Sequence, residues 1–124
     1  MAARFEVKIA KNGEYMFNLI APNGQVIATS ETYTAKHNCL GGIESVRTNA
    51  RAHVEDQIAG GATLLCPKYE LFLDKEGKPR FRLIAANGEI ICASQGYTTK
   101  SAAQGGIASI GENAPQAQIV FLGE

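Results

Sequence analysis

The sequence lacks an excess of either charge, a long apolar run and a regular set of cysteines. Lysine plus arginine and aspartate plus glutamate are equal at 12 each, which gives no reason to expect nucleic-acid or membrane binding. No apolar run approaches the roughly 18 residues of a membrane span, and the N-terminal residues enter a strand pattern instead of a secretory signal. Cys39, Cys66 and Cys92 are too few and irregular for a disulfide framework. We therefore expect free thiols and a cytoplasmic protein.

The chain contains an internal repeat. A shift of 64 residues aligns residues 12–50 with residues 76–114 without a gap, and 18 of the 39 aligned positions are identical. A unit of about 60 residues is near the lower limit for independent folding, so we expect the two copies to share one core. The predicted organisation is a first repeat at 1–60, a linker at 61–67 and a second repeat at 68–124, all within a single structural domain.

Each repeat begins with a pattern typical of three strands. In the first repeat, apolar residues alternate with polar ones from Phe5 to Ile9, and Phe17, Leu19 and Ala21 lie on one face of a second strand. Asn23-Gly24 then separates two strand-like runs, which indicates a hairpin with a type I′ turn. The second repeat has the same pattern 64 residues later, with Asn87-Gly88 at the turn.

A helix and a last strand complete each repeat. Thr34 and Thr98 are the candidate N-caps, and Asn49 and Asn113 mark the helix ends because asparagine tolerates the left-handed conformation. Apolar residues recur on one helix face at i, i+4, i+7 and i+11: Cys39, Ile43, Val46, Ala50 and Ala103, Ile107, Ile110, Ala114. The last strand is clear at residues 118–122 and weak at residues 52–55.

The motif S-x-x-Y-T-x-K followed by G-G-I-x-S-[VI]-x-x-N-A occurs twice, each time after an Asn-Gly hairpin. On this doubled motif, the chain resembles the YegP-like domain family over nearly its whole length. The resemblance implies small bacterial and archaeal α+β proteins made of βββαβ units. It implies two tandem units that form one antiparallel sheet, with two helices on one face and the last strands exchanged between units. It implies no established activity.

A repeated cluster at the strand-to-helix turn is the first candidate site. Tyr33 with Lys36, and Tyr97 with Lys100, can form a binding site in which lysine supplies the cation and tyrosine a platform or a hydrogen-bond donor. The alternative is structural, with a capped helix N-terminus and a packed tyrosine. The structural alternative is favoured, since duplication retains folding residues in both copies more readily than two active sites.

The second candidate is a flank of small and polar residues beside the apolar helix stripe. Glycine inside a helix costs about 1 kcal/mol relative to alanine, so we expect a neighbour to approach closely there. We predict that the two helices meet along this flank, and the alternative is that the glycines leave room for Tyr33 and Tyr97 beneath the helices. The flank consists of Gly41, Gly42, Ser45, Asn49, Gly105, Gly106, Ser109 and Asn113.

The third candidate is a basic row on the second strand of repeat two. Lys78, Arg80 and Arg82 follow a period of two and could bind an anion or nucleic acid. However, strand pairing should place Glu70 and Asp74 on the same face, so we expect cross-strand ion pairs to neutralise most of the row.

No catalytic constellation, metal-ligand spacing or cofactor motif is present, so we expect no enzyme activity, no metal and no cofactor. The favoured function is a non-enzymatic module that binds an unknown protein or small molecule, with anion binding through the basic row as the alternative. We expect a monomer in which the repeats form an intramolecular pseudo-dimer. Dimerisation through the open sheet face is the alternative, because Met16, Ile20, Phe72 and Ile84 should point away from the helices.

Overall fold

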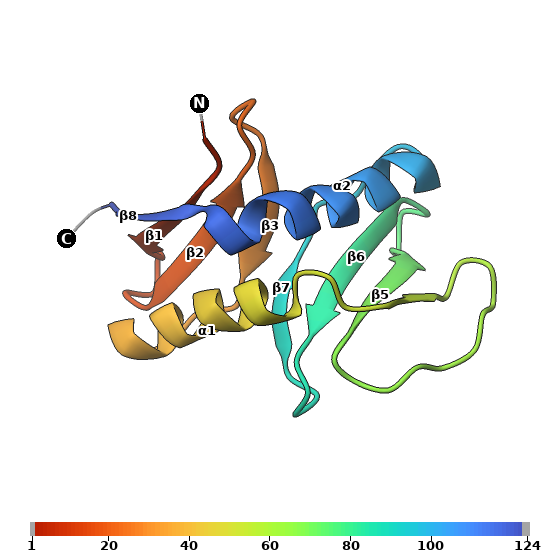
Figure 1. The fold of residues 1–124 in the computed structure, drawn as a ribbon, viewed down its shortest axis with the longest axis horizontal. Coiled ribbons are helices and arrows are strands. Elements are labelled where there is room, and N and C mark those ends of the chain that lie inside the picture. The colour runs from red at the N-terminus through yellow and green to blue at the C-terminus, as the bar shows by residue number, and fades with distance from the viewer. Residues whose placement is uncertain (1, 123–124) are drawn as a thin grey trace.

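The predicted strands form in both repeats of the computed structural model, which describes residues 2–122 (Figure 1). They are β1 (Arg4–Ile9), β2 (Tyr15–Ile20), β3 (Val26–Ser30), β5 (Lys68–Leu73), β6 (Pro79–Ile84) and β7 (Ile90–Ala93). The β1–β2 and β5–β6 hairpins have the same register, because Arg4 pairs with Ile20 and Lys68 pairs with Ile84. The internal repeat of the sequence is therefore a repeat of structure.

Each repeat places its last strand against the first strand of the other repeat. Within residues 2–122 the fold is α+β, with one eight-stranded sheet in the order β4-β5-β6-β7-β3-β2-β1-β8. Here β8 (Gln118–Phe121) pairs with β1, and β4 (Val54–Asp56) pairs with β5, and both pairings are parallel. The sheet is therefore mixed, and the prediction of a purely antiparallel sheet is wrong. Neither parallel pair is joined by a short hairpin, which would require antiparallel strands, because a connection of 11 residues separates β4 from β5, and β1 and β8 belong to different repeats.

The Asn23-Gly24 hairpin is present, but its turn is not type I′. Gly24 has a φ of +87°, while no non-glycine residue of the described chain has a positive φ, so Asn23 lacks the conformation that type I′ requires. Gly24 N donates to Ala21 O at 2.9 Å and Ala21 N donates to Gln25 O at 2.8 Å. These contacts define a three-residue loop with glycine at the left-handed bulge position. The same contacts recur at residues 85–89.

Both helices begin one residue later than predicted. They are α1 (Lys36–Asn49) and α2 (Lys100–Asn113). Thr99 caps α2 by accepting a hydrogen bond from Ala102 N at 3.0 Å, whereas Ala35 stands at the equivalent position of α1 without a side-chain cap. The N-caps predicted at Thr34 and Thr98 are therefore wrong by one position.

The predicted helix ends are confirmed, but the role expected for the asparagines is wrong. The residues after Asn49 and Asn113 stay in the right-handed region. The Asn49 side chain instead donates to Ser45 O at 2.9 Å, and Asn113 does the same to Ser109 O at 2.9 Å. A short 3-10 turn, η1 (Ala114–Gln116), follows α2. These bonds hold the last helical turn without a left-handed residue.

The core lies between the sheet and the helices, which run across one face in Figure 1. Phe17 and Leu19 of β2 are fully buried there, as are Phe81 and Leu83 of β6. Contacts of α1 with β2 and β7, and of α2 with β6 and β3, join both repeats in that core. Neither helix in residues 2–122 has the length and apolar composition that a membrane-spanning helix needs.

The apolar side chains predicted on the opposite face of the sheet are exposed only in part. Four apolar side chains were predicted there: Met16, Ile20, Phe72 and Ile84. Ile20 and Ile84 lie outside the buried cluster beneath the helices, but they are only 3% and 6% exposed. The Arg82 guanidinium lies 4.7 Å from the centre of the Phe72 ring and covers it. Met16 and Phe72 are partly exposed, so dimerisation through this face stays a prediction.

The two helices do not meet along the glycine flank. A Cβ atom built on Gly42 would meet the Tyr33 ring beneath α1, and one built on Gly41 would meet no atom of another element within 4 Å. The helices approach each other near their C-terminal ends, where Arg51 Nε donates to Gly111 O at 3.2 Å. The helix-seam prediction is therefore wrong, and the alternative, in which the glycines make room for tyrosine, is the one found.

Candidate functional site

Tyr33 and Tyr97 lie in the loops that join the third strand of each repeat to its helix. The backbone of Tyr33 pairs with Tyr15 through bonds of 2.8 and 2.7 Å, and Tyr97 N donates to Pro79 O at 2.7 Å. These bonds hold the two loops against β2 and β6. Burial raises the pKa of both tyrosine hydroxyls. Each tyrosine is therefore a fixed, half-buried side chain and not a mobile surface residue.

Gly42 and Gly106 provide the space that these rings occupy. A Cβ atom on Gly42 would lie 2.3 Å from the Tyr33 hydroxyl oxygen, and one on Gly106 would lie 2.5 Å from that of Tyr97. Beneath α2, the Tyr97 ring stacks on Phe81 with centroids 6.3 Å apart. In each repeat, the glycine lets an aromatic ring pass directly under the helix.

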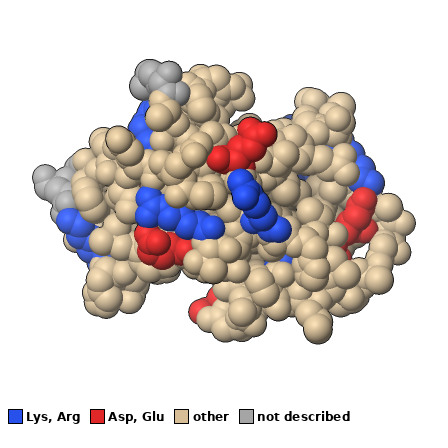
Figure 2. All heavy atoms as spheres, viewed as in Figure 1, with Lys and Arg blue, Asp and Glu red and all other residues tan. Residues whose placement is uncertain are grey.

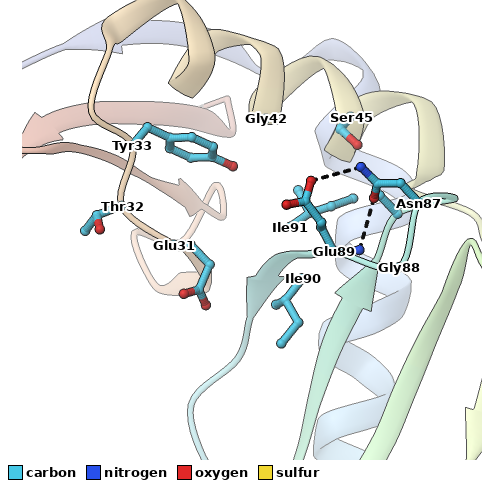
Figure 3. Close-up of a pocket in the computed structure, with 11 residues that line it drawn as sticks. Glu31, Thr32, Tyr33, Gly42, Ser45, Asn87, Gly88, Glu89, Ile90 and Ile91 are labelled. Carbon is cyan, nitrogen blue, oxygen red and sulfur yellow. Dashed lines mark hydrogen bonds between the residues drawn. The ribbon is translucent and has the colours of Figure 1, made fainter.

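A cleft of about 660 Å³ opens beside Tyr33, between the two repeats (Figure 3). One wall comes from the β3–α1 loop and α1, and the other from the β6–β7 hairpin. Figure 3 shows Ser45 pointing from α1 toward Asn87, with Glu89 between Asn87 and Tyr33. Glu89 Oε1 accepts a hydrogen bond from Asn87 Nδ2 at 2.9 Å. The lining residues are Glu31, Thr32, Tyr33, Gly42, Ser45, Ala85, Asn87, Gly88, Glu89, Ile90 and Ile91.

A second cleft of about 550 Å³ lies beside Tyr97 and has the reverse composition. Its helix wall comes from repeat two and its hairpin wall from repeat one. Ten of the eleven positions that line the first cleft have their aligned residue in the second. The identical pairs are Tyr33/Tyr97, Gly42/Gly106, Ser45/Ser109, Ala85/Ala21, Asn87/Asn23 and Ile91/Ile27. We call the cleft beside Tyr33 cleft one and the cleft beside Tyr97 cleft two.

The two clefts have apolar and polar groups side by side. Each combines a tyrosine edge and aliphatic side chains with a hydroxyl and an amide, which is the mixture typical of small-molecule sites. Within the described part of the chain, no group of three histidine, cysteine, aspartate or glutamate side chains could hold a metal ion. Cys39 and Cys92 are buried in the core, away from either cleft, and Cys66 is partly exposed; all three are free thiols, as predicted.

Lys36 and Lys100 do not join the tyrosines in the clefts. Lys36 Nζ lies 4.3 Å from the centre of the Phe121 ring in β8. Lys100 Nζ forms an ion pair of 2.6 Å with Asp56 in β4. Each lysine therefore contacts the last strand of the other repeat. In each repeat, the tyrosine of the predicted tyrosine–lysine cluster therefore lines a cleft, whereas the lysine contacts an exchanged strand.

The basic row is paired with acidic side chains, as the strand register predicted. Arg82 Nε lies 2.6 Å from Glu70, which is its direct partner across β5 and β6. Arg80 Nε lies 3.4 Å from Asp74, and the third cation, Lys78, pairs with an exposed glutamate at 3.7 Å. The row lies on the sheet face away from the helices, and on the helix-bearing face Figure 2 also shows charges of both signs. The geometry therefore does not favour anion binding by this row.

The hairpins are parts of the site that the sequence did not predict. Asn87 and Asn23 were assigned only to turns, yet each lines the cleft of the opposite repeat. The one signal available was that the asparagine and the following glycine are identical in both repeats. That signal has a sufficient explanation in turn geometry, so it could not by itself indicate a binding wall.

Comparison with known proteins assigns a family to this architecture. Residues 10–56 and 74–120 each match the family described as "Domain of unknown function (DUF1508)". The chain is 41% identical over 117 residues to a UPF0339 protein of Pseudomonas aeruginosa, covering 94% of both chains. It is 38% identical over 109 residues to the UPF0339 protein YegP of Yersinia pestis, covering 88% of this chain and 86% of the relative.

Two solved structures have the same fold. The solution structure of a UPF0339 protein from Shewanella oneidensis matches with a TM-score of 0.79 at 38% identity, covering 98% of this chain and 92% of the other. That of the E. coli protein of unknown function YegP matches with a TM-score of 0.80 at 36% identity, covering 98% and 93%. No enzymatic activity is part of these names.

Proposed function

The chain belongs to the DUF1508 family of YegP-like proteins, and we propose that it is a non-enzymatic module that binds small ligands in two matched clefts between its repeats. One observation carries the proposal: two clefts share ten aligned lining positions, and each takes one wall from each repeat. Core packing accounts for Gly42 and the Tyr33 ring. Ser45 and Asn87, which face each other across the opening in Figure 3, add a hydroxyl and an amide to the walls of the first cleft.

Anchored polar groups support this proposal. The Asn87 side chain is fixed by two bonds to Glu89. Asn87 Nδ2 donates to Glu89 Oε1 at 2.9 Å, and Asn87 Oδ1 accepts from Glu89 N at 3.0 Å. Asn49 Nδ2 lies 3.3 Å from Ser45 Oγ and orients that hydroxyl from within α1. Binding sites whose polar groups are already fixed lose less entropy when a ligand binds. The clefts therefore have the rigid walls and few polar groups that a small ligand requires.

Nuclear magnetic resonance tests the proposal through a titration of nitrogen-15-labelled protein with a fragment set of small polar aromatic compounds. We expect shifts at the backbone amides of Asn87 and Ile91 for cleft one, and of Asn23 and Ile27 for cleft two. Shifts confined to the opposite sheet face, or no shifts with any compound, would contradict the proposal.

One variant and a matched control test whether a ligand binds in cleft two. A Cβ atom on Gly105 meets nothing within 4 Å, and this residue lines cleft two. A Gly105→Leu substitution should therefore fill the cleft without disturbing the core, and should abolish ligand shifts at Asn23 and Ile27. Gln104→Leu is the control, because Gln104 is exposed on the same helix and outside the cleft.

For assembly, we propose a monomer in which the repeats form an intramolecular pseudo-dimer about a pseudo-twofold axis, located in the cytoplasm. The exchange of β4 and β8 inside one chain supports this, because it uses the strand pairing that a dimer of single repeats would need. Equal numbers of acidic and basic residues give no support to a nucleic-acid partner. Light scattering after size exclusion tests the monomer, and a mass of two chains would contradict it.

A further inference from the structure

The two clefts differ chiefly in charge. Of the ten shared lining positions, six hold identical residues and two more exchange glutamate for glutamine. Glu31 of cleft one aligns with Gln95 of cleft two, and Glu89 aligns with Gln25. Glutamate and glutamine have nearly the same shape, so the exchange leaves the walls similar and adds two negative charges to cleft one only.

The two carboxylates stand on opposite walls of cleft one. Glu31 follows β3 of the first repeat, and Glu89 belongs to the hairpin of the second (Figure 3). Burial is the main cause of the raised pKa of the Tyr33 hydroxyl, followed by Cys39 and Cys92 and then by the two carboxylates, whereas burial alone raises that of Tyr97. The electrostatic potential in cleft one is therefore more negative than in cleft two.

Neither carboxylate is neutralised by a neighbouring cation. Most acidic side chains of this protein are ion-paired, for example Glu70 with Arg82 and Asp56 with Lys100. Among the described residues, the Glu89 carboxylate is bonded only to the neutral Asn87 side chain, and the Glu31 carboxylate pairs with no lysine or arginine. Two unpaired carboxylates facing one cleft favour a cation between them.

We infer that cleft one selects ligands that carry an ammonium or guanidinium group on an apolar body, while cleft two takes neutral ligands of similar shape. This inference rests on the proposed function. In cleft one, the cation would lie between Glu31 and Glu89, and the apolar body would lie against Tyr33 and Ile91. In cleft two, Gln25 and Gln95 offer hydrogen bonds without the charge.

The test compares benzylammonium with benzyl alcohol, two probes of similar shape and different charge, in the same resonance titration. Benzylammonium should bind cleft one more tightly than cleft two, and added salt should reduce the difference. Benzyl alcohol should show no such preference. Because exposed ion pairs contribute modestly, we expect roughly a two- to fivefold change in affinity for each carboxylate.

Reciprocal variants supply the decisive control. The pair Glu31→Gln and Glu89→Gln should reduce benzylammonium binding at cleft one to the level of cleft two. The pair Gln25→Glu and Gln95→Glu should raise it at cleft two. If both probes bind the clefts and neither exchange changes the preference, the charge inference is wrong and the proposed function stands. If neither probe shifts resonances in either cleft, both are wrong.

Discussion

A Cβ atom on Gly42 would lie 2.3 Å from the Tyr33 hydroxyl oxygen, closer than any real contact allows. The aligned Gly106 has the same relationship with Tyr97, at 2.5 Å. The second glycine of each helical pair is therefore required by the ring beneath it. The first glycine, Gly41, has no such neighbour within 4 Å, so the two glycines of one pair should respond to substitution in opposite directions.

Gly41→Ala should stabilise the protein and Gly42→Ala should destabilise it. Alanine at an unobstructed helix position gains about 0.5–1 kcal/mol over glycine. At Gly42, the same gain is opposed by displacement of the Tyr33 and Phe17 rings, and overpacking typically costs about 1–3 kcal/mol. Urea unfolding of both variants measures the difference. Equal stabilisation by the two substitutions would show that Tyr33 can move aside without cost.

Tyr69→Phe should cost about 1–2 kcal/mol of unfolding free energy. The Tyr69 hydroxyl is fully buried and donates to Ala50 O at 2.8 Å, at the end of α1. Its removal leaves a buried carbonyl without that partner. Tyr97→Phe is the control, because its hydroxyl lies beside an open cleft, and it should change stability by less than about 0.5 kcal/mol. Thermal or urea unfolding decides, and an equal cost for both variants would contradict the argument.

The strands and helices could be predicted because each depends on local periodicity. The alternation around Phe17 and Leu19 fixes which face of β2 is buried, and the apolar spacing from Cys39 to Ala50 fixes the buried stripe of α1. The exact first residue of a helix depends on one or two backbone hydrogen bonds, so the N-caps were predicted less accurately than the helices themselves. Thr98 and Thr99 are adjacent and are equally suitable as caps of α2, and only the geometry shows that Thr99 is the cap.

The clefts could not be predicted, because their walls come from different repeats. They exist where β3 pairs with β7 through Thr29 with Ala93 and Ser30 with Cys92, and no local pattern specifies that pairing. The prediction that the lysines lie beside the tyrosines was wrong for a related reason. Lys36 is close to Tyr33 in sequence, but the start of α1 directs its side chain toward β8, whose position depends on strand exchange.

Stability should fall with acid through the titration of Glu55. A hydrogen bond from Lys68, with further bonds from Gln57 and the backbone of Leu64, lowers the pKa of Glu55 to about 2. Since the native carboxyl binds its proton only at lower pH than the unfolded one, its contribution is complete above about pH 5 and is lost as the pH falls toward 2. Urea unfolding across this range should show the loss.

Glu55→Gln should remove part of that acid sensitivity. The variant should be less stable than the parent near neutral pH, because Lys68 loses its closest carboxylate at 2.6 Å. The difference should narrow as the pH approaches 2. Glu112→Gln, at an exposed position of α2, is the control. A constant difference between parent and Glu55→Gln at all pH values would contradict the assignment.

Only one cysteine should react rapidly in the folded protein. Cys39 and Cys92 are buried. Burial raises the pKa of the Cys39 thiol, and it raises the pKa of the Cys92 thiol to about 12, so neither forms the reactive thiolate readily. Cys66 is partly exposed in the connection between β4 and β5. Titration with a thiol reagent without reductant should find one fast group in native protein and three after unfolding. A Cys66→Ser variant should lose the fast group.

Cutting the chain between Gly60 and Gly61 should produce two fragments that fold only together. The cut leaves β4 on the first fragment and its partner β5 on the second, and it likewise separates β1 from β8. Alone, the first fragment would expose unpaired edges at β1, β3 and β4, and the second fragment at β5, β7 and β8. A unit of about 60 residues buries too little surface to compensate.

We therefore expect the cleaved protein to elute as one complex under native conditions. Separated fragments should be unfolded or self-associated by circular dichroism and size exclusion, and mixing should restore the native spectrum. Two fragments that are each folded and monomeric would show that the exchanged strands are dispensable, whereas recovery on mixing would show that they hold the repeats together.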